Sequence, residues 1–298
     1  MLKEWTWMEK IILYYKYLSI YKPKALVDAQ RSLCQKLGLR GRIIIATEGI
    51  NGTLGGSEEA IELYKKTMNA DPQFVDIDYK ESNGSKNDFP RLTVKHKNEI
   101  VRLDIASENA PIKDRGEYLT PQEFHAKLTQ KNPNLVLLDA RNAYESRIGT
   151  FVGAVTPSIK TFRELPTYLD THKEQFKNKE VIMFCTGGVR CERATAYVKK
   201  QHIATKVYHL KGGIHRYLEA YPDGFFRGKN FVFDGRMAMA TNNDCLTQCD
   251  TCTTPYDTYS HCQYQPCHNL IIQCPSCQNS LNHCCSKQCQ QALNSQLT

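Results

Sequence analysis

The segment best suited to nucleophilic chemistry begins at Cys185, directly after the apolar run at residues 181–184, which predicts a buried strand. Gly187 and Gly188 allow the chain to turn tightly, so that several backbone N–H groups point at the Cys185 sulfur. Together with Arg190 and the start of a helix, these N–H groups favour the thiolate over the thiol. Because the thiolate is the nucleophilic form of cysteine, Cys185 is the candidate catalytic nucleophile, with Arg190 stabilising the anionic sulfur.

The length of the loop separates the two chemistries that such a cradle supports. A cysteine, a loop and an arginine serve either phosphate-ester hydrolysis or sulfur transfer through a persulfide, and the phosphatase loop is one residue longer. Here the intervening residues are Thr186, Gly187, Gly188 and Val189. The shorter loop favours persulfide chemistry. Core packing, the usual role of an unpaired cysteine, requires neither the glycines nor the arginine.

Cys191 lies just past Arg190, where a helix is expected to emerge and to be established from Arg193. We expect its side chain to face away from the anion site, so that Cys191→Ser costs less activity than Cys185→Ser. Equal loss in both variants would instead indicate that a Cys185–Cys191 redox pair does the chemistry.

Further segments resemble rhodanese domains, and they occur in the order found in that family. These are the strand at 135–139 with its Asp-Ala-Arg end, Tyr144-Glu145, the glycine-flanked segment 149–154, and the Leu-Lys-Gly-Gly-Ile turn at 210–214. The resemblance covers about residues 120–225 and implies a doubly wound parallel sheet.

Asp139 and Arg141 are the candidate supports of the binding crevice. They follow a parallel strand at its carboxyl end, where doubly wound sheets form their ligand crevice. The alternative is a structural role, in which Arg141 and Glu145 form an ion pair that ties the loops together.

The composition predicts an ordinary globular protein of two or three domains. The 298 residues are 41% hydrophobic and 23% charged, and no apolar run approaches the roughly 18–20 residues that span a membrane. The N-terminal segment has no apolar run long enough for a signal peptide, so a cytoplasmic location is expected. The residues after 235 include two basic and three acidic side chains, a net charge of −1. Since the whole chain has a net charge of +8, the first 235 residues carry about +9, which permits an anionic partner.

Residues 1–105 are predicted to form a ferredoxin-like α+β domain. Strands are expected at 11–19, 41–46, from 53, at 74–80 and at 92–105, with helices at 25–37 and from Ser57, a turn at 48–52 and a polar loop at 81–87. The polar segment 106–119 is expected to be a linker, and residues 120–234 a rhodanese domain built on alternating strands and helices.

Residues 235–298 are predicted to form a cysteine-rich, metal-binding tail. Ten of the thirteen cysteines lie after residue 240, in a chain with no export signal, which favours metal binding over disulfides. Nine of them suffice for two four-coordinate zinc sites with one to spare: Cys249, Cys252, Cys262, Cys267, Cys274, Cys277, Cys284, Cys285 and Cys289. Additional candidates are Cys245, His261, His268 and His283.

Zinc in the tail would be structural, because the tail has too few large apolar residues to fold on hydrophobic burial alone. Two alternatives remain open at this point. One is a redox-active iron–sulfur cluster, and the other is a disulfide between the adjacent Cys284 and Cys285, which a reducing compartment disfavours. The spacing does not determine which ligands share a metal.

The three-part order resembles the tRNA uridine 34 hydroxylases, a rhodanese-containing family. The motifs that carry the resemblance are residues 41–53, residues 89–95, Thr161-Phe-Arg163, the Cys185 loop and Cys284-Cys-Ser286. The resemblance implies hydroxylation of the wobble uridine of tRNA to 5-hydroxyuridine, with molecular oxygen as co-substrate. Composition and spacing by themselves do not indicate this reaction, and the extra Cys245 leaves the ligand set open.

The residues alone support a sulfurtransferase that carries a persulfide on Cys185 to a protein or RNA acceptor. A non-enzymatic metal-binding adaptor is a third interpretation, which the intact Cys185 loop disfavours. A protein that donates sulfur or electrons is a further expected partner. For tRNA, the N-terminal sheet offers Arg42, Arg91, Lys95 and Lys97 on what is expected to be an open face. Solvated edge-strand charges are the alternative interpretation of these four cations.

Overall fold

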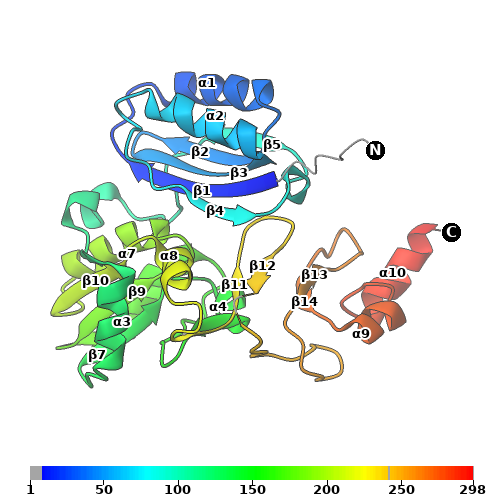
Figure 1. Cartoon of the computed structure of the whole chain (residues 1–298). Coiled ribbons are helices and arrows are strands. Elements are labelled where there is room, and N and C mark those ends of the chain that lie inside the picture. Colours follow the sequence, from blue (N-terminus) through cyan, green and yellow to red (C-terminus); the bar gives the residue numbers. More distant parts are fainter. Residues whose placement is uncertain (1–8, 241, 298) are drawn as a thin grey trace.

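A computed structural model describes residues 9–240 and 242–297 of the chain, which fold into three consecutive parts (Figure 1). The N-terminal part is a five-stranded sheet with two helices on one face. Its elements are β1 (Glu9–Tyr17), α1 (Pro23–Lys36), β2 (Arg40–Ala46), β3 (Gly49–Ser57), α2 (Glu58–Asn69), β4 (Lys80–Asn83), η1 (Lys86–Asp88) and β5 (Leu92–His96).

The strand order β4-β1-β3-β2-β5 confirms the predicted ferredoxin-like domain and adds β5 as an edge strand parallel to β2. Alternation along β1 explains its position: Ile12 and Tyr14 are buried in the core under the helices, whereas Leu13 and Tyr15 point to the opposite face. Helix α2 begins where predicted, because the Ser57 side chain accepts a hydrogen bond from the Ala60 N–H at 3.3 Å.

Three boundaries of this domain differ from the prediction. Strand β5 ends at His96, although an extended segment was expected to continue to residue 105. Strand β3 already begins at Gly49, inside the expected turn, because the reversal between β2 and β3 takes only two residues. Strand β4 lies mostly in the expected polar loop, while the segment predicted to be extended at 74–80 forms a turn at 74–76 and no regular element at 77–79. Strand β4 is an edge strand, which pairs on one side only. Its four residues pair with β1 from Lys10↔Asn83 to Leu13↔Lys80 and show no apolar pattern that would predict a strand.

The central part confirms the predicted doubly wound parallel sheet, with strand order β6-β10-β9-β7. Its elements are β6 (Glu117–Leu119), α3 (Pro121–Thr129), β7 (Leu135–Asp139), α4 (Ala143–Arg147), α5 (Leu165–Thr171), α6 (Lys173–Phe176), β9 (Glu180–Phe184), α7 (Val189–Lys200), β10 (Lys206–Leu210) and α8 (Gly213–Ala220).

Strand β9 is buried on both faces. Val181 and Met183 belong to the core under α5 and α7, whereas Ile182 and Phe184 belong to the core under α3 and α8. This explains the continuous apolar run in the sequence, since a strand between two helical layers has no solvent face. Strand β6, which pairs with β10, falls within the segment expected to be a linker, after the short helices η2 (Ser107–Asn109) and η3 (Ile112–Asp114).

A small antiparallel sheet joins the central part to the tail. It contains β8 (Gly149–Phe151), β11 (Phe226–Phe231) and β12 (Ala238–Ala240), and the tail follows with β13 (Tyr259–His261), β14 (Leu270–Ile272), α9 (Pro275–Ser280) and α10 (Lys287–Leu297). The Tyr259 hydroxyl donates to the Tyr144 carbonyl at 2.9 Å and Arg147 pairs with Asp250, so the tail is docked beside α4. No helix of the described residues is long and apolar enough to cross a membrane.

Candidate active site

Cys185 directly follows β9, and the three loop residues 186–188 separate it from α7. The helix already begins at Val189, four residues before the expected Arg193, and its N-cap Gly188 has φ 101°, a conformation that side chains disfavour. Gly213 closes the other side of the loop: a Cβ there would lie 2.4 Å from the Cys185 carbonyl oxygen. The glycines therefore let the loop and the start of α8 pack against each other.

The surroundings of the Cys185 sulfur stabilise the thiolate. Burial, the largest single influence, raises the pKa of the thiol. A hydrogen bond from Cys191, the charge of Arg190 and the N–H groups of Arg190 and Gly188 outweigh it and lower the pKa to about 5. The Gly188 N–H lies 3.2 Å from the sulfur. Cys185 is thus a thiolate at neutral pH, as the sequence predicted.

The expectation that Cys191 faces away from the anion site is wrong. Its side chain is fully buried and hydrogen-bonds to the Cys185 sulfur. The early start of α7 explains the difference. Side chains of a helix tilt toward its N-terminus, and Cys191, in the first turn, therefore points back at the loop that holds Cys185.

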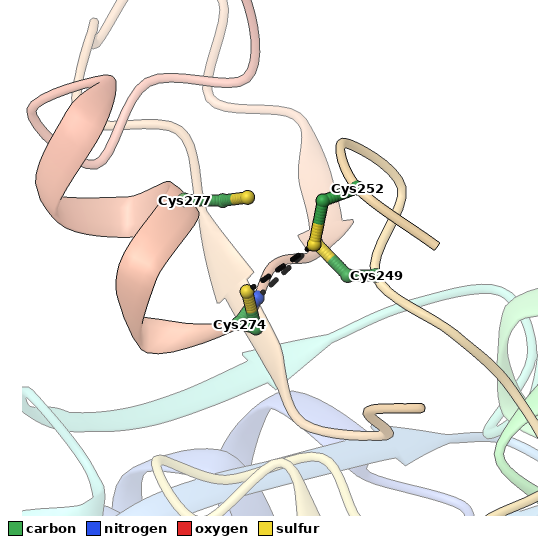
Figure 2. Close-up of side chains that lie close together, drawn as sticks. All are labelled: Cys249, Cys252, Cys274 and Cys277. Carbon is green, nitrogen blue, oxygen red and sulfur yellow. Dashed lines mark hydrogen bonds between the residues drawn. The ribbon is translucent and has the colours of Figure 1, made fainter. Parts of the chain in front are cut away.

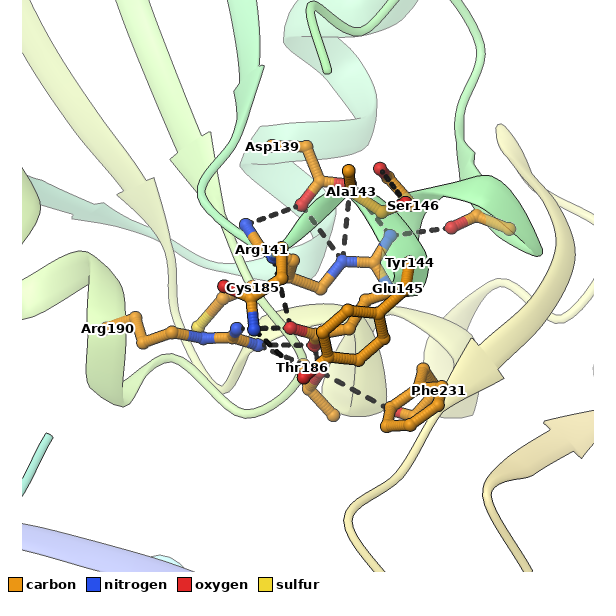
Figure 3. Close-up of polar contacts among 12 residues, drawn as sticks. Asp139, Arg141, Ala143, Tyr144, Glu145, Ser146, Cys185, Thr186, Arg190 and Phe231 are labelled. Atoms are coloured by element: carbon orange, nitrogen blue, oxygen red, sulfur yellow. Dashed lines mark hydrogen bonds and ion pairs between the residues drawn. The ribbon is translucent and has the colours of Figure 1, made fainter. Parts of the chain in front are cut away.

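Arg190 is held by Glu145 rather than being free to pair with a ligand. Two hydrogen bonds of 2.6 and 2.7 Å join the guanidinium to both carboxylate oxygens, and both side chains are buried (Figure 3). The Glu145 charge balances Arg190, while the arginine still lowers the pKa of Cys185 through its charge.

The alternative ion pair between Arg141 and Glu145 is wrong, because Arg141 pairs with Asp139. Their closest nitrogen–oxygen distance is 2.7 Å, both side chains are fully buried, and Arg141 also donates to the Gly149 carbonyl at 2.6 Å (Figure 3). Neither residue lines the cavity at Cys185. Asp139 and Arg141 thus tie β7 to β8 and support the crevice indirectly.

Removing the Glu145 carboxylate should destabilise the fold strongly. In Glu145→Ala the buried Arg190 charge loses its partner, so we expect the free energy of unfolding in urea to fall by about 3–5 kcal/mol. The matched control is Glu174→Ala, whose carboxylate is 81% exposed and pairs with Lys177 on the surface. That variant should change stability by less than about 0.5 kcal/mol. Similar losses in the two variants would contradict a structural role for the Glu145–Arg190 pair.

A cavity of about 790 Å³ lies where the N-terminal sheet meets the Cys185 loop. Leu13 and Tyr15 of β1 line one side, and Cys185, Gly187 and Arg190 line the other. The expectation of an open sheet face is therefore wrong: the side of the sheet opposite the helices covers the Cys185 loop.

Contacts between the two parts fix this arrangement. The Tyr15 hydroxyl donates to the Glu192 carboxylate at 2.9 Å, and Arg193 of α7 pairs with Glu48 of the N-terminal part at 2.7 Å. Lys80 is buried in the same interface, with its ammonium 5.3 Å from the centre of the Tyr15 ring. These residues carry no sequence motif that identifies them as interface residues.

The four cations expected on the sheet divide into two groups. Arg42 and Lys97 line the cavity, and neither side chain has a hydrogen-bond or ion-pair partner within residues 9–240 and 242–297. Arg91 and Lys95 are exposed and lie outside the cavity lining.

The cavity lining also includes residues that carry no sequence motif of a site, among them His215, Phe233 and Arg236. Phe233 is 46% exposed, although it is a large apolar side chain, and the Arg190 guanidinium lies 5.7 Å from its ring centre. Arg163 is a further lining residue, and the Thr161-Phe-Arg163 motif was its only sequence signal.

Eight tail cysteines form two groups of four, each with its sulfur atoms within 4.8 Å of one another. The first comprises Cys249, Cys252, Cys274 and Cys277 (Figure 2), and the second comprises Cys262, Cys267, Cys285 and Cys289. Sulfurs at the corners of a tetrahedron with metal–sulfur bonds of about 2.3 Å lie about 3.8 Å apart. The observed sulfur–sulfur distances of 3.6 Å fit that geometry, so each group can bind a metal ion.

Cys284 is the cysteine left over: it is buried and belongs to neither group. The alternative disulfide between Cys284 and Cys285 does not form, and the Cys285 sulfur instead lies 3.6 Å from those of Cys267 and Cys289. Cys245 is exposed and also lies outside both groups. The candidate ligands His261, His268 and His283 are likewise absent from the groups found among the described residues.

Known proteins match the chain in all three parts. Residues 9–100 match the UPF0176 acylphosphatase-like domain, residues 120–220 the rhodanese-like domain, and residues 227–290 the rhodanese C-terminal domain. A tRNA uridine(34) hydroxylase of Corynebacterium diphtheriae is 36% identical over 90% of both chains. One of onion yellows phytoplasma is 38% identical over 88% of this chain and 86% of its own.

The chain belongs to the tRNA uridine(34) hydroxylase family. Rhodanese-like domain-containing protein 6 of Arabidopsis thaliana is also 37% identical to it, over 90% of this chain and 50% of the plant protein. In this member of the family, the activated Cys185 lines a cavity that the N-terminal sheet and the central part enclose together.

Proposed function

We propose that this chain hydroxylates C5 of uridine 34 in tRNA, with molecular oxygen as co-substrate and Cys185 at the centre of the reaction. The observation that carries the proposal is the stabilised Cys185 thiolate in a cavity with two unpaired cations, in a chain of the tRNA uridine(34) hydroxylase family. Arg190 and the loop residues Thr186, Gly187, Gly188 and Val189 hold that thiolate, and Cys191 donates a hydrogen bond to it.

A thiolate can activate the carbon to be hydroxylated. Sulfur nucleophiles add to C6 of a uracil ring, which is electron-poor, and the addition makes the neighbouring C5 electron-rich. Burial of the sulfur favours this step, because a thiolate without a water shell is more reactive toward carbon. The N–H groups around the sulfur then stabilise it again when it leaves.

The cavity would receive the nucleotide after it leaves the anticodon stack. Enzymes that modify a base extrude the nucleotide and bind the base by stacking and hydrogen bonds. Phe233 offers an exposed ring for stacking, while Arg42 and Lys97 offer unpaired charge for the flanking phosphates. Arg91 and Lys95, outside the cavity, are proposed to contact the tRNA backbone farther from the base.

Removing both unpaired cations of the cavity should weaken tRNA binding and its dependence on salt. In Arg42→Gln with Lys97→Gln, two phosphate contacts are lost, so the log–log slope of affinity against salt should become shallower by about 1.5 units. The control is Lys36→Gln with Lys66→Gln, which removes equal charge from helices α1 and α2 on the opposite face. Equal slopes for the two double variants, measured by fluorescence anisotropy, would exclude the cavity cations as tRNA contacts.

Zinc is the metal proposed for both tail groups, in a structural role. Four cysteine sulfurs in tetrahedral spacing are the donor set of structural zinc, and the N–H groups of Thr251 and Cys274 donate to the Cys249 sulfur at 3.4 Å each. The zinc would supply folding energy to the tail and would leave no open coordination position for a substrate.

We also propose a cytoplasmic location, which suits a tRNA substrate and the exposed free thiol of Cys245. We propose one further partner, a protein that supplies electrons or sulfur. It would act on the Cys185 sulfur, which lines the cavity.

Nucleoside mass spectrometry tests the proposed reaction directly. Purified full-length chain is incubated with unmodified tRNA and a thiol reductant under ¹⁸O₂, and the tRNA is then digested to nucleosides. We expect 5-hydroxyuridine that carries one ¹⁸O atom, and none under nitrogen. Absence of this nucleoside under all reductants, or incorporation of oxygen from water, would overturn the proposal.

A persulfide-carrying sulfurtransferase is the second candidate, because the Cys185 loop on its own also suits that activity. Transfer of sulfur from thiosulfate to cyanide, without any change in the tRNA nucleosides, would favour it. The two assays on one protein preparation therefore distinguish the candidates.

A further inference from the structure

The contact between the Cys185 and Cys191 sulfurs has a consequence beyond the acidity of Cys185. The two side chains are fully buried and hydrogen-bonded to each other, and they come from the loop and from the first turn of α7. The remaining cysteine of the first 240 residues, Cys34, lies in the core of the N-terminal domain. Cys185 and Cys191 therefore form an isolated pair at the active site.

The pair is asymmetric in access. Cys185 lines the cavity, whereas Cys191 does not and lies behind it. Formation of a disulfide would bring the two hydrogen-bonded sulfurs to the S–S bond length of about 2.0 Å. Cys185 stands in the loop that contains Gly187 and Gly188, whereas Cys191 is fixed in the first turn of α7, so the movement would come from the loop.

The pair is also asymmetric in protonation. Burial and the neighbouring thiolate raise the pKa of Cys191 well above its usual value, while that of Cys185 is lowered to about 5. One sulfur is thus a thiolate and the other a thiol at neutral pH. This is the arrangement in which an attacking thiolate and a second, resolving thiol carry out disulfide chemistry.

We propose, on the basis of the proposed function, that the Cys185–Cys191 pair supplies the two electrons that hydroxylation requires and forms a disulfide once per turnover. One atom of O₂ is inserted into the C5–H bond of the uridine. The other atom leaves as water, which takes one proton from the Cys191 thiol and one from solvent, because Cys185 starts as a thiolate. The O₂ molecule thus takes four electrons, two from the C5–H bond and two from the sulfurs, between which the S–S bond forms.

A dithiol reductant of the thioredoxin class would restore the pair. Its thiolate attacks the Cys185 sulfur, the one that lines the cavity, which forms a mixed disulfide and releases Cys191. Its second thiol then attacks the mixed disulfide, which leaves the reductant oxidised and Cys185 as a thiolate. Cys191 is accordingly a redox residue, and its replacement by serine should stop turnover.

The test is a single turnover without external reductant. Reduced full-length chain is freed of reductant under nitrogen and mixed with unmodified tRNA, and O₂ is admitted. We expect about one 5-hydroxyuridine per chain, together with a Cys185–Cys191 disulfide in the peptide map. In Cys191→Ser the yield should fall at least about tenfold. The control Cys245→Ser, an exposed cysteine outside both metal groups, should match the unaltered chain.

Serine separates electron supply from simple positioning, because its hydroxyl can still donate a hydrogen bond to Cys185 but cannot form a disulfide. Iodoacetamide alkylation of Cys185 should therefore keep an acidic midpoint in Cys191→Ser while the burst of product is lost. A full burst in Cys191→Ser, or product without the disulfide in the unaltered chain, would overturn the inference.

Failure of the proposed function is recognised separately. If no 5-hydroxyuridine forms even with reductant present, the hydroxylation itself is wrong, whatever the cysteines do. The pair is then examined without tRNA in glutathione redox buffers, where peptide mapping should show the Cys185–Cys191 disulfide alone. A glutathione mixed disulfide on Cys185, with no Cys185–Cys191 disulfide in any buffer, would overturn the redox pair.

Discussion

Cys185→Ser is expected to abolish tRNA hydroxylation while leaving the fold intact. Loss of the nucleophile should lower the rate by at least about 10³-fold, because a serine hydroxyl with no adjacent base is not ionised at neutral pH. The fold should survive, since the serine oxygen can accept the hydrogen bond that the Gly188 N–H now donates to sulfur. Arg190 also keeps its buried partner Glu145, so no charge is left unpaired.

Activity assays on tRNA and thermal unfolding of the same samples check this expectation. Cys245→Ser is the control, because it removes a sulfur that is exposed and lies outside both the active site and the metal groups. A Cys185→Ser variant that still hydroxylates tRNA would move the chemistry away from this cavity. A variant that fails to fold would show that Cys185 packs the core, the usual role of a buried cysteine.

The low pKa of Cys185 predicts how the reactivity of its sulfur depends on pH. Its pKa is lowered to about 5, so the thiolate persists above that pH and is lost as the pH falls through it. Alkylation of Cys185 by iodoacetamide should therefore rise with a midpoint near pH 5 rather than near 9. A midpoint near 9 would mean that burial outweighs the hydrogen bonds and the charge of Arg190.

The chemistry of the loop was predictable because its determinants are local. The apolar run before Cys185 indicated a buried strand, and the glycines indicated the tight turn that follows. The start of α7 was not predictable in the same way. Its N-cap is Gly188, which has no side chain to hydrogen-bond the first turn and so leaves none of the usual cap signals. The position of Cys191 depended on that boundary.

The cavity could not be predicted, because it depends on how two domains pack. Alternation along β1 indicates that Leu13 and Tyr15 share a face, yet nothing local indicates what covers that face. Arg42 was singled out for its charge, and the structure gives the further fact that it lies across the cavity from Cys185. The partner of Arg190 was equally hidden, since Glu145 is distant in sequence and was paired with Arg141 in the expected arrangement.

The tail cysteines were predictable as ligands but not as sets. Cysteines with two to four residues between them belong together, because one short turn can present both sulfurs to one metal. The groups, however, alternate along the chain: the first and third pairs form one group, and the second and fourth pairs form the other. Only the fold of the β13–β14 hairpin brings the separated pairs together.

This alternation predicts that the two metal sites of the tail fold as one unit. Purified chain should contain about two zinc ions, and Cys274→Ser should reduce that number to below one, rather than to one. Cys262 follows β13 directly, and β14 ends two residues before Cys274, so the hairpin connects the two groups. When the first group loses its metal, the hairpin loses its anchor and the second group comes apart.

The expected consequence is local unfolding of the chain after residue 240. Metal binding contributes about 10–16 kcal/mol to the folding of such small cysteine sites, far more than the sparse apolar contacts of the tail. Strong chelation of the unaltered chain and the Cys274→Ser substitution should therefore expose the same protease sites, with the central domain still protected. Cys245→Ser, which removes a cysteine outside both groups, should keep both zinc ions and the protection.

Elemental analysis with limited proteolysis decides among the outcomes. One zinc ion retained in Cys274→Ser, with a protected second group, would mean that the sites fold independently despite their alternation. Iron with acid-labile sulfide in the unaltered chain would show that the tail holds a redox cluster instead of structural zinc.

The contacts that dock the tail connect its folding to catalysis. The Tyr259 hydroxyl donates to the carbonyl of Tyr144, the residue before Glu145. A chain with an unfolded tail should therefore also lose activity, because the residue that holds Arg190 in place loses its support.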